Sequence, residues 1–183
     1  MKLTPNQVTL SRLIILVLII ISYESKFFFL GTALLIIGLL SDALDGYIAR
    51  KFKKGTEVGI FLDQFIDKIY VHSLLLYFLA KGNISFLIVL IIILRDHVAV
   101  AIRYFGVLNG QVIKSIWSGK LKLWLQGFLL VFIALHMVEV IPANALSIFG
   151  TFTAAWSAVS LLHFMLANRI TINSFFESLS IDA

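Results

Sequence analysis

The sequence predicts an all-α protein that crosses a membrane as a bundle of six helices, with both termini in the cytoplasm. Of its 183 residues, 60% are hydrophobic, and they gather in six runs separated by short polar or glycine-containing segments. A bilayer core of about 30 Å takes roughly 20 apolar residues per helix, so this length leaves room for about six spans and little else. We therefore expect one polytopic membrane domain over residues 1–183.

The six apolar runs cover residues 13–21, 28–40, 69–79, 86–94, 123–136 and 146–165. Several of them are shorter than a full span, so polar neighbours of the second, third and fourth runs should lie at membrane depth or at the interface. The first residues, MKLTPNQVTLSR, are not followed by a small-residue cleavage site, and we interpret them as a retained segment.

The basic residues predict the orientation of the bundle. Most lie in the connections near 50–54 and 114–122 or at the two ends, as Lys2, Arg12 and Arg169, whereas the other connections hold only Lys26 and Lys81. The positive-inside rule then places both termini and both basic connections in the cytoplasm, which an even number of spans also requires. Residues 170–183 are expected to form a short cytoplasmic tail.

Charge and cysteine content narrow the function classes. A net charge of +5 on a membrane protein is typical of cytoplasmic loops and anionic headgroups, so we expect membrane lipid and no nucleic acid as a partner. The absence of cysteine excludes disulfides, thiolate metal sites and thiol nucleophiles. Carboxylates or histidines must hold any metal.

Four aspartates are concentrated between the second and third runs: Asp42, Asp45, Asp63 and Asp67. On a helix, the first pair lies about 60° apart and the second about 40° apart, so each pair shares a face. The short basic segment 51–56 lets the two helices run antiparallel, which allows the two faces to meet at one level.

These carboxylates need cations or protons. A charge at membrane depth costs between roughly 3 and 10 kcal/mol or more, and four acids at one level would also repel one another. Aspartate oxygens without thiols suit Mg²⁺ or Mn²⁺, and two such divalent cations would balance four negative charges. A structural polar contact or a proton relay is the alternative for a single pair.

Small residues accompany the acids. Gly46 and Ala49 follow Asp45 within one turn, and Gly59 lies one turn before Asp63, so a bulky ligand could approach the backbone. Arg50 could direct its planar fork at a phosphate over Gly46. The set favours a diphosphate site, although Gly46 and Ala49 could also serve helix packing.

The run DALDGYIARKFKKGTEVGIFLDQFID, residues 42–67, resembles the signature of the CDP-alcohol phosphotransferases: D, two residues, DG, two, AR, eight, G, three, D, three, D. Every fixed position matches. The resemblance implies a six-helix membrane fold over the whole chain and an enzyme that transfers a phosphatidyl group from CDP-diacylglycerol to an alcohol. A bacterial inner membrane, with the active site on the cytoplasmic side, is the location that it implies.

The resemblance also implies residue roles. Asp42, Asp45 and Asp63 would be metal ligands, and Asp67 would contact the second metal and act as the catalytic base for the acceptor hydroxyl. Gly46, Arg50 and Thr56 would contact the CDP portion of the donor, beside Ala49 and Gly59. The segment PNQVTLSR is similar to the family's donor-binding N-terminal stretch, which adds Asn6, Gln7 and Thr9, although Thr4-Pro5 could simply begin a helix.

The acceptor is the least constrained part. RDH at 95–97 and GKLKLWLQ at 119–126 are similar to family members that use glycerol 3-phosphate, while Gln64, Asp96 and Leu123 depart from their usual residues. Candidate phosphate-binding cations are Arg95, Arg103, Lys114, Lys120 and Lys122. Alternatively, Asp96 and Arg103 neutralise each other and the three lysines are positive-inside residues.

Three other functions stay open at this point. Inositol phosphate, or phosphatidylglycerol as for cardiolipin synthesis, could be the acceptor, and a homodimer is compatible with the sequence. A cation or proton transporter could also use intramembrane carboxylates, but it would not need Gly46, Arg50 and Gly59 at these spacings.

Overall fold

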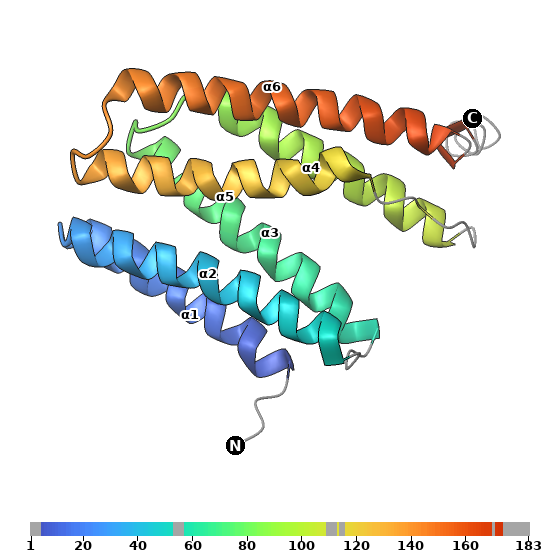
Figure 1. Ribbon diagram of the computed structural model, residues 1–183, viewed down its shortest axis with the longest axis horizontal. Helices are drawn as coiled ribbons and strands as arrows, with labels where there is room; N and C mark the ends of the chain where they lie inside the picture. The colour runs from blue at the N-terminus through green and yellow to red at the C-terminus, as the bar shows by residue number, and fades with distance from the viewer. Residues whose placement is uncertain (1–4, 53–56, 109–112, 114–115, 170, 174–183) are drawn as a thin grey trace. The chain divides into compact units, whose positions relative to one another are not determined.

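The computed structural model describes residues 5–52, 57–108, 113, 116–169 and 171–173, and the described chain forms helices and no strands. Six helices follow one another: α1 (Pro5–Glu24), α2 (Phe28–Phe52), α3 (Glu57–Ala80), α4 (Phe86–Leu108), α5 (Trp117–Met137) and α6 (Ala143–Ala167) (Figure 1). Side chains are described throughout these ranges except at 5–11, 42–52, 57–65, 67 and 108. The predicted all-α class is confirmed for the described residues.

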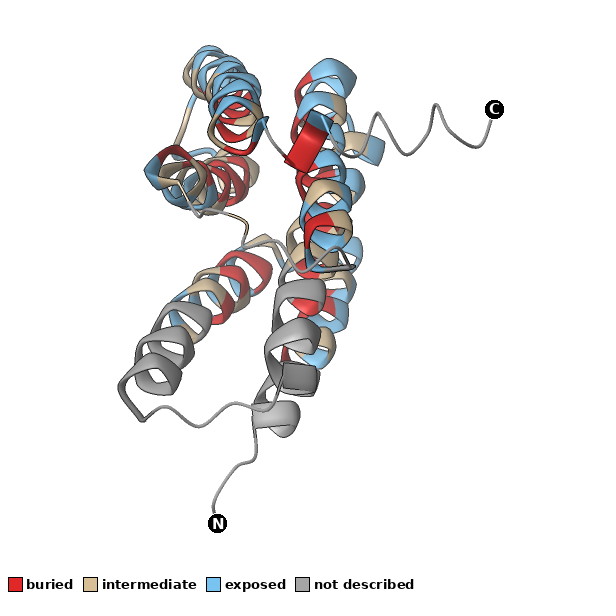
Figure 2. Cartoon of the chain, turned by 90° about the vertical axis from the view of Figure 1, so that its right-hand side faces the viewer, coloured by how far each residue is buried: buried red, intermediate tan, exposed pale blue. Residues whose placement is uncertain are grey.

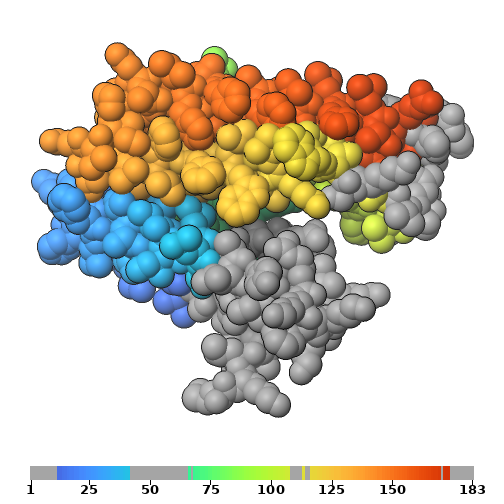
Figure 3. Space-filling model, viewed as in Figure 1, coloured from blue at the N-terminus to red at the C-terminus, as the bar shows by residue number. Residues whose placement is uncertain are grey.

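Among the described residues, two helices are both long and apolar enough to cross a bilayer, α5 and α6. Shorter apolar segments lie within α2 at Phe28–Ser41 and within α3 at Lys68–Ala80. Large side chains on the outside of the helices are strongly exposed, for example Phe29 at 77% and Leu166 at 72%. Figure 3 shows the outer side of α6, drawn in orange to red. These features are those of a helical membrane protein, because water-soluble surfaces rarely carry so much exposed apolar area.

The chain divides into two compact units. The first comprises the chain up to Ile84 together with Gly127–Ser147, which holds α1, α2, α3 and the second half of α5. Here α1 packs against both α2 and α3. The Tyr23 ring lies against the rings of Tyr77 and Phe78 on α3, with centroids 6.1 and 5.4 Å away. The Tyr23 and Thr32 hydroxyls are 3.1 Å apart, and Thr32 donates to the carbonyl of Ala134 on α5.

Helices α1, α3 and α5 end in the same way, with a residue in the left-handed region. Lys26, Gly82 and Glu139 have φ of 63°, 75° and 60°. After α1, Phe27 donates to the carbonyl of Ser22 and Lys26 to that of Tyr23, and equivalent bonds close the other two helices. This Schellman pattern satisfies the last carbonyls of each helix and lets the chain reverse within a few residues.

The second unit comprises Ser85–Gln126 and the chain from Ile148 onward, which holds α4, the first half of α5 and most of α6. Figure 2 shows how buried residues gather on one side of a helix and exposed residues on the other. The buried side of α6 carries Thr153, Ser157 and Ser160, whose hydroxyls donate to carbonyls of their own helix. Such small residues allow close helix approach in a membrane.

Two expectations concern segments that the structure describes in part. The basic connection was expected to extend from 114 to 122, but α5 begins at Trp117, so Lys120 and Lys122 lie in a helix. Residues 170–183 were expected to form a short cytoplasmic tail; within it, residues 171–173 are helical, and Thr171 and Ile172 are buried. The rest of the tail lies outside the described residues.

Candidate functional site

The four aspartates predicted to bind metal lie on two consecutive helices of the first unit. Asp42 and Asp45 belong to α2, and Asp63 and Asp67 to α3. Their side chains lie outside the described set, so their roles as ligands and as base stay predictions. The described residues include no group of three or more His, Asp or Glu side chains that could hold a metal.

A described contact between α2 and α3 lies next to these positions. The Tyr70 hydroxyl of α3 reaches the backbone of Gly38 on α2, where an added Cβ would be only 2.5 Å from the tyrosine Oη. Asp42 lies four residues beyond Gly38, and Asp67 three residues before Tyr70. Asp45 and Asp63 each lie seven residues from the contact. Because the two helices run in opposite directions (Figure 1), these steps lead to the same side of the contact.

The residues predicted to bind the CDP-lipid lie in the same part of the chain. Gly46, Ala49 and Arg50 belong to α2, and Gly59 to α3. Asn6, Gln7 and Thr9 lie in the first turns of α1, which begins at Pro5, as the helix-start interpretation also predicted. The side chains of all seven are outside the described set, and so is Thr56 entirely.

The second unit contains a buried cluster of charged and polar side chains, which we call the Asp96 cluster: Arg95, Asp96, Lys122, Gln126 and Ser160. Lys122 is 1% exposed and Asp96 2%. One carboxylate oxygen of Asp96 accepts hydrogen bonds from Lys122 Nζ and from Arg95 Nη1, the latter at 3.1 Å. The other oxygen accepts a hydrogen bond from Gln126 Nε2 at 3.3 Å. The cluster joins α4 to α5.

Arg95 extends the Asp96 cluster to α6. Its Nε donates to Ser160 Oγ at 3.0 Å, and its Nη2 lies beside Gly119, where an added Cβ would be 3.4 Å away. The guanidinium is therefore held in a fixed direction by partners on α4 and α6. A planar fork held in this way suits a phosphate or carboxylate, which it can bind through two parallel hydrogen bonds.

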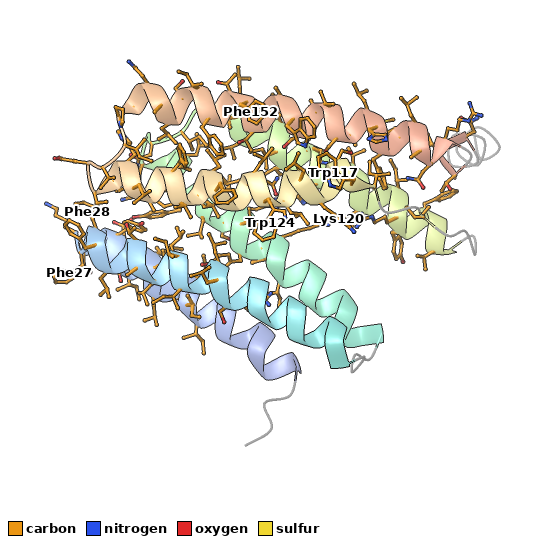
Figure 4. The ribbon with its side chains drawn as sticks, viewed as in Figure 1. Phe27, Phe28, Trp117, Lys120, Trp124 and Phe152 are labelled. Carbon is orange, nitrogen blue, oxygen red and sulfur yellow. The ribbon has the colours of Figure 1, made fainter. Side chains whose placement is uncertain are left out.

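The other candidate cations are placed differently. Arg103 is exposed, and its guanidinium lies 5.5 Å from the centroid of the Phe164 ring. Lys120 is exposed on α5, four residues before Trp124 (Figure 4). Lys114 lies outside the described residues. Of the five predicted cations, the structure brings Arg95 and Lys122 together.

The alternative interpretation paired Asp96 with Arg103. The structure gives Asp96 ion pairs with Arg95 and Lys122. Lys122, a positive-inside residue in the same alternative, is 1% exposed and forms an ion pair with Asp96. An i, i+7 spacing on one helix suggested Arg103, whereas contacts across helices decide the pairing.

Sequence reasoning assigned no role to Gly38, Tyr70, Gln126 or Ser160. For Gln126 and Ser160, the spacing of polar residues along a helix could have indicated a role. Gln126 follows Lys122 by four residues, so both lie on one face of a helix. Ser157 and Ser160 form a polar stripe on an otherwise apolar run. The Gly38–Tyr70 contact has no such local signal, because it joins residues 32 positions apart.

Comparison with known proteins identifies the class. The family model described as CDP-alcohol phosphatidyltransferase matches residues 2–172. The chain therefore belongs to the CDP-alcohol phosphatidyltransferase family, and it is a phosphatidyltransferase. Members of this family generally depend on divalent metal ions and are associated with membranes.

Curated relatives carry more specific names. A protein of Rickettsia typhi named "CDP-diacylglycerol--glycerol-3-phosphate 3-phosphatidyltransferase" is 32% identical over 133 residues, which are 71% of this chain and 75% of the relative. A protein of Bacillus subtilis with the same name is 28% identical over 170 residues, 85% of this chain and 86% of the relative. A "Probable phosphatidylglycerophosphate synthase" of Mycobacterium tuberculosis is 31% identical over 87 residues, 48% of this chain and 41% of the relative.

Proposed function

We propose that the chain is a phosphatidylglycerophosphate synthase, which transfers the phosphatidyl group of CDP-diacylglycerol to glycerol 3-phosphate and releases CMP. The observation that carries the proposal is the set of relatives with this name that align over most of the chain. The protein is expected to span the cell membrane six times with both termini in the cytoplasm, since the basic residues lie in alternate connections. A bacterial inner membrane and a homodimer are compatible with it.

Asp42, Asp45, Asp63 and Asp67 are proposed to hold two divalent cations, Mg²⁺ or Mn²⁺. The Gly38–Tyr70 contact supports this assignment, because Asp42 and Asp45 lie four and seven residues beyond Gly38 on α2, and Asp67 and Asp63 lie three and seven residues before Tyr70 on α3. Carboxylate oxygens are the ligands these hard cations prefer. When bound, the metal ions neutralise the diphosphate and stabilise the departing CMP.

In the reaction, a hydroxyl of glycerol 3-phosphate attacks the phosphorus that carries diacylglycerol. The new P–O bond forms as the bond from that phosphorus to the CMP oxygen breaks, and the hydroxyl proton passes to Asp67 as general base. Arg50, with Gly46, Ala49, Thr56 and Gly59 beside it, is proposed to hold the nucleotide diphosphate. Asn6, Gln7 and Thr9 are proposed to contact the nucleotide from α1.

The acceptor phosphate is proposed to bind to cations of the predicted set, with Arg95 and Lys122 as the first candidates. Arg95 is fixed by Ser160 and Asp96, so its fork is oriented before a ligand arrives. A preorganised fork loses less conformational entropy on binding than a mobile one. Arg103, Lys114 and Lys120 remain candidates for attracting the dianion to the site.

A CMP-release assay on the purified protein tests the proposal. CDP-diacylglycerol and Mg²⁺ or Mn²⁺ are supplied with glycerol 3-phosphate, inositol phosphate, serine or phosphatidylglycerol in parallel. Release with glycerol 3-phosphate supports the proposal, whereas release with inositol phosphate or phosphatidylglycerol alone would assign the chain to a sibling activity. A protein that releases CMP with none of them would refute the enzymatic assignment.

A further inference from the structure

Gly38 and Tyr70 meet more closely than other residue types would allow. Tyr70 is 5% exposed, and its hydroxyl lies directly on the α2 backbone. An added Cβ at Gly38 would be 2.5 Å from Tyr70 Oη but 3.4 Å from Tyr70 Cζ and from Ile15 Cγ2. The first distance is far below van der Waals contact, and the other two are close to it. An added Cβ at position 38 would therefore clash with the hydroxyl oxygen, and the tyrosine side chain or the helix would have to shift.

The same contact stands at one end of the segment that carries the aspartates. Residues 53–56 join α2 to α3 at the other end, and the four aspartates lie between this connection and the Gly38–Tyr70 contact. With a rise of about 1.5 Å per residue, Asp67 and Asp42 are about 4.5 and 6 Å from the contact along their helices, and Asp45 and Asp63 about 10 Å. The Gly38–Tyr70 contact thus fixes the two helices to each other on one side of the acidic positions.

Tyr70 is suited to fix a distance between helices. Its ring is rigid, with two side-chain torsions, and a helical side chain leans toward the N-terminal end of its helix, which is the end of α3 that carries Asp67 and Asp63. Ile15 of α1 touches the same point, so three helices of the first unit meet there. A change in this contact would alter how far α2 stands from α3 near the carboxylates.

We propose that Tyr70 is a positioning residue for the reaction: its ring, packed against Gly38, sets the separation of α2 and α3 at which the aspartates of both helices share the same metal ions. The inference rests on the proposed metal site. A displacement of about 1 Å in a catalytic constellation can lower the rate by about 100-fold, so a modest change in helix separation should be measurable.

The test is a double-mutant cycle at positions 38 and 70, with two single variants and the double variant. Gly38→Ala places a methyl group against the hydroxyl and should reduce kcat at least 10-fold and raise the Mn²⁺ concentration for half-maximal activity. Tyr70→Phe removes only the oxygen and should keep activity within about threefold of wild type. The double variant Gly38→Ala/Tyr70→Phe leaves the methyl group at ordinary contact distances and should regain most of the lost activity.

Two glycines provide matched controls. Gly31 lies on the same helix against Tyr23, where an added Cβ would be 3.1 Å from the ring, but it is seven residues farther from the aspartates. Gly127 on α5 has open space around its Cβ position. Gly31→Ala should lower thermal stability without changing the Mn²⁺ dependence of the active fraction, and Gly127→Ala should change neither.

The outcomes are decisive in either direction. Full activity of Gly38→Ala, a loss that Tyr70→Phe does not relieve, or a Tyr70→Phe defect as large as that of Gly38→Ala would overturn the proposal. If Gly38→Ala does not fold, Tyr70→Leu removes the ring without adding atoms. It should raise the Mn²⁺ requirement at least 10-fold, and an unchanged requirement would contradict the inference.

Failure of the proposed function can be told apart from failure of this inference. Mn²⁺ binding to wild type and variants, followed by electron paramagnetic resonance, needs no substrate. Weaker Mn²⁺ binding in Gly38→Ala that recovers in the double variant supports the positioning role even if glycerol 3-phosphate is not the acceptor. Equal Mn²⁺ binding in all variants would contradict it even if the enzyme is active.

Discussion

Replacing Asp96 by asparagine tests whether the Asp96 cluster depends on one negative charge. In the structure this carboxylate accepts hydrogen bonds from Arg95, Lys122 and Gln126, and it is 2% exposed. Asparagine keeps the shape of the side chain but removes the charge. The two cations then remain buried near each other without the anion that they share.

The expected loss is large. Removing one partner of a buried ion pair typically costs about 3–5 kcal/mol, because the charge left behind stays out of water. For a chain of this length, each kcal/mol shifts Tm by about 2–4 °C, so Asp96→Asn should lower Tm by about 6–20 °C. Thermal unfolding of the detergent-solubilised protein, followed by tryptophan fluorescence and circular dichroism, measures the shift. Trp156 is a suitable reporter, since its Nε1 donates to the Ser118 carbonyl in the same unit.

Two further variants separate the charge effect from other causes. Asp96→Asn/Lys122→Met removes one buried cation together with the anion and should recover at least half of the lost Tm. Lys120→Met removes an exposed lysine two residues away on α5 and should change stability by less than about 0.5 kcal/mol. A Tm of Asp96→Asn within 2 °C of wild type, or a double variant as unstable as the single one, would refute the reasoning.

Three other predictions follow from the proposed site and from the first unit. Asp67→Asn should abolish CMP release while leaving most of the affinity for CDP-diacylglycerol, as measured by lipid-nucleotide binding; loss of donor and metal binding instead would make Asp67 chiefly a ligand. Chelation with EDTA should abolish turnover, and Mg²⁺ or Mn²⁺ should restore it; activity that persists in EDTA would contradict the metal assignment. Tyr23→Phe removes the hydroxyl near Thr32 and should cost about 1 kcal/mol in thermal stability with kcat unchanged, and a variant as stable as wild type would show that this hydroxyl contributes nothing.

The helices were predictable from hydropathy, but their ends were not. The apolar run ends at residue 40, whereas α2 continues to Phe52 through Arg50 and through Asp42 and Asp45, which were expected to lie on a helix. A prediction based only on apolar runs misses this part of the helix because it is polar. Its Ala, Leu and Arg residues nevertheless favour helix formation. In the same way, three lysines near the start of α5 suggested a loop, while two of them lie in the helix.

Features of the candidate site that depend on one helix could be predicted from the sequence, whereas contacts between helices could not. That the aspartates, Gly46 and Arg50 lie on helices was predictable, because spacing on one helix decides which positions share a face, and their roles stay predictions. The ion pair of Asp96 with Lys122 and the contact of Tyr70 with Gly38 depend on how different helices pack. No local pattern specifies such contacts, so the sequence suggested Arg103 as the partner of Asp96 and assigned Tyr70 no role.

The most direct test of the central claim is to identify the lipid product. Purified protein is incubated with CDP-diacylglycerol, Mg²⁺ and isotopically labelled glycerol 3-phosphate, and lipids and nucleotides are quantified by mass spectrometry. The account predicts labelled phosphatidylglycerophosphate and CMP in equal amounts, and neither product with Asp67→Asn. CMP release without incorporation of the label, or a phosphatidyl product formed only with another acceptor, would contradict it.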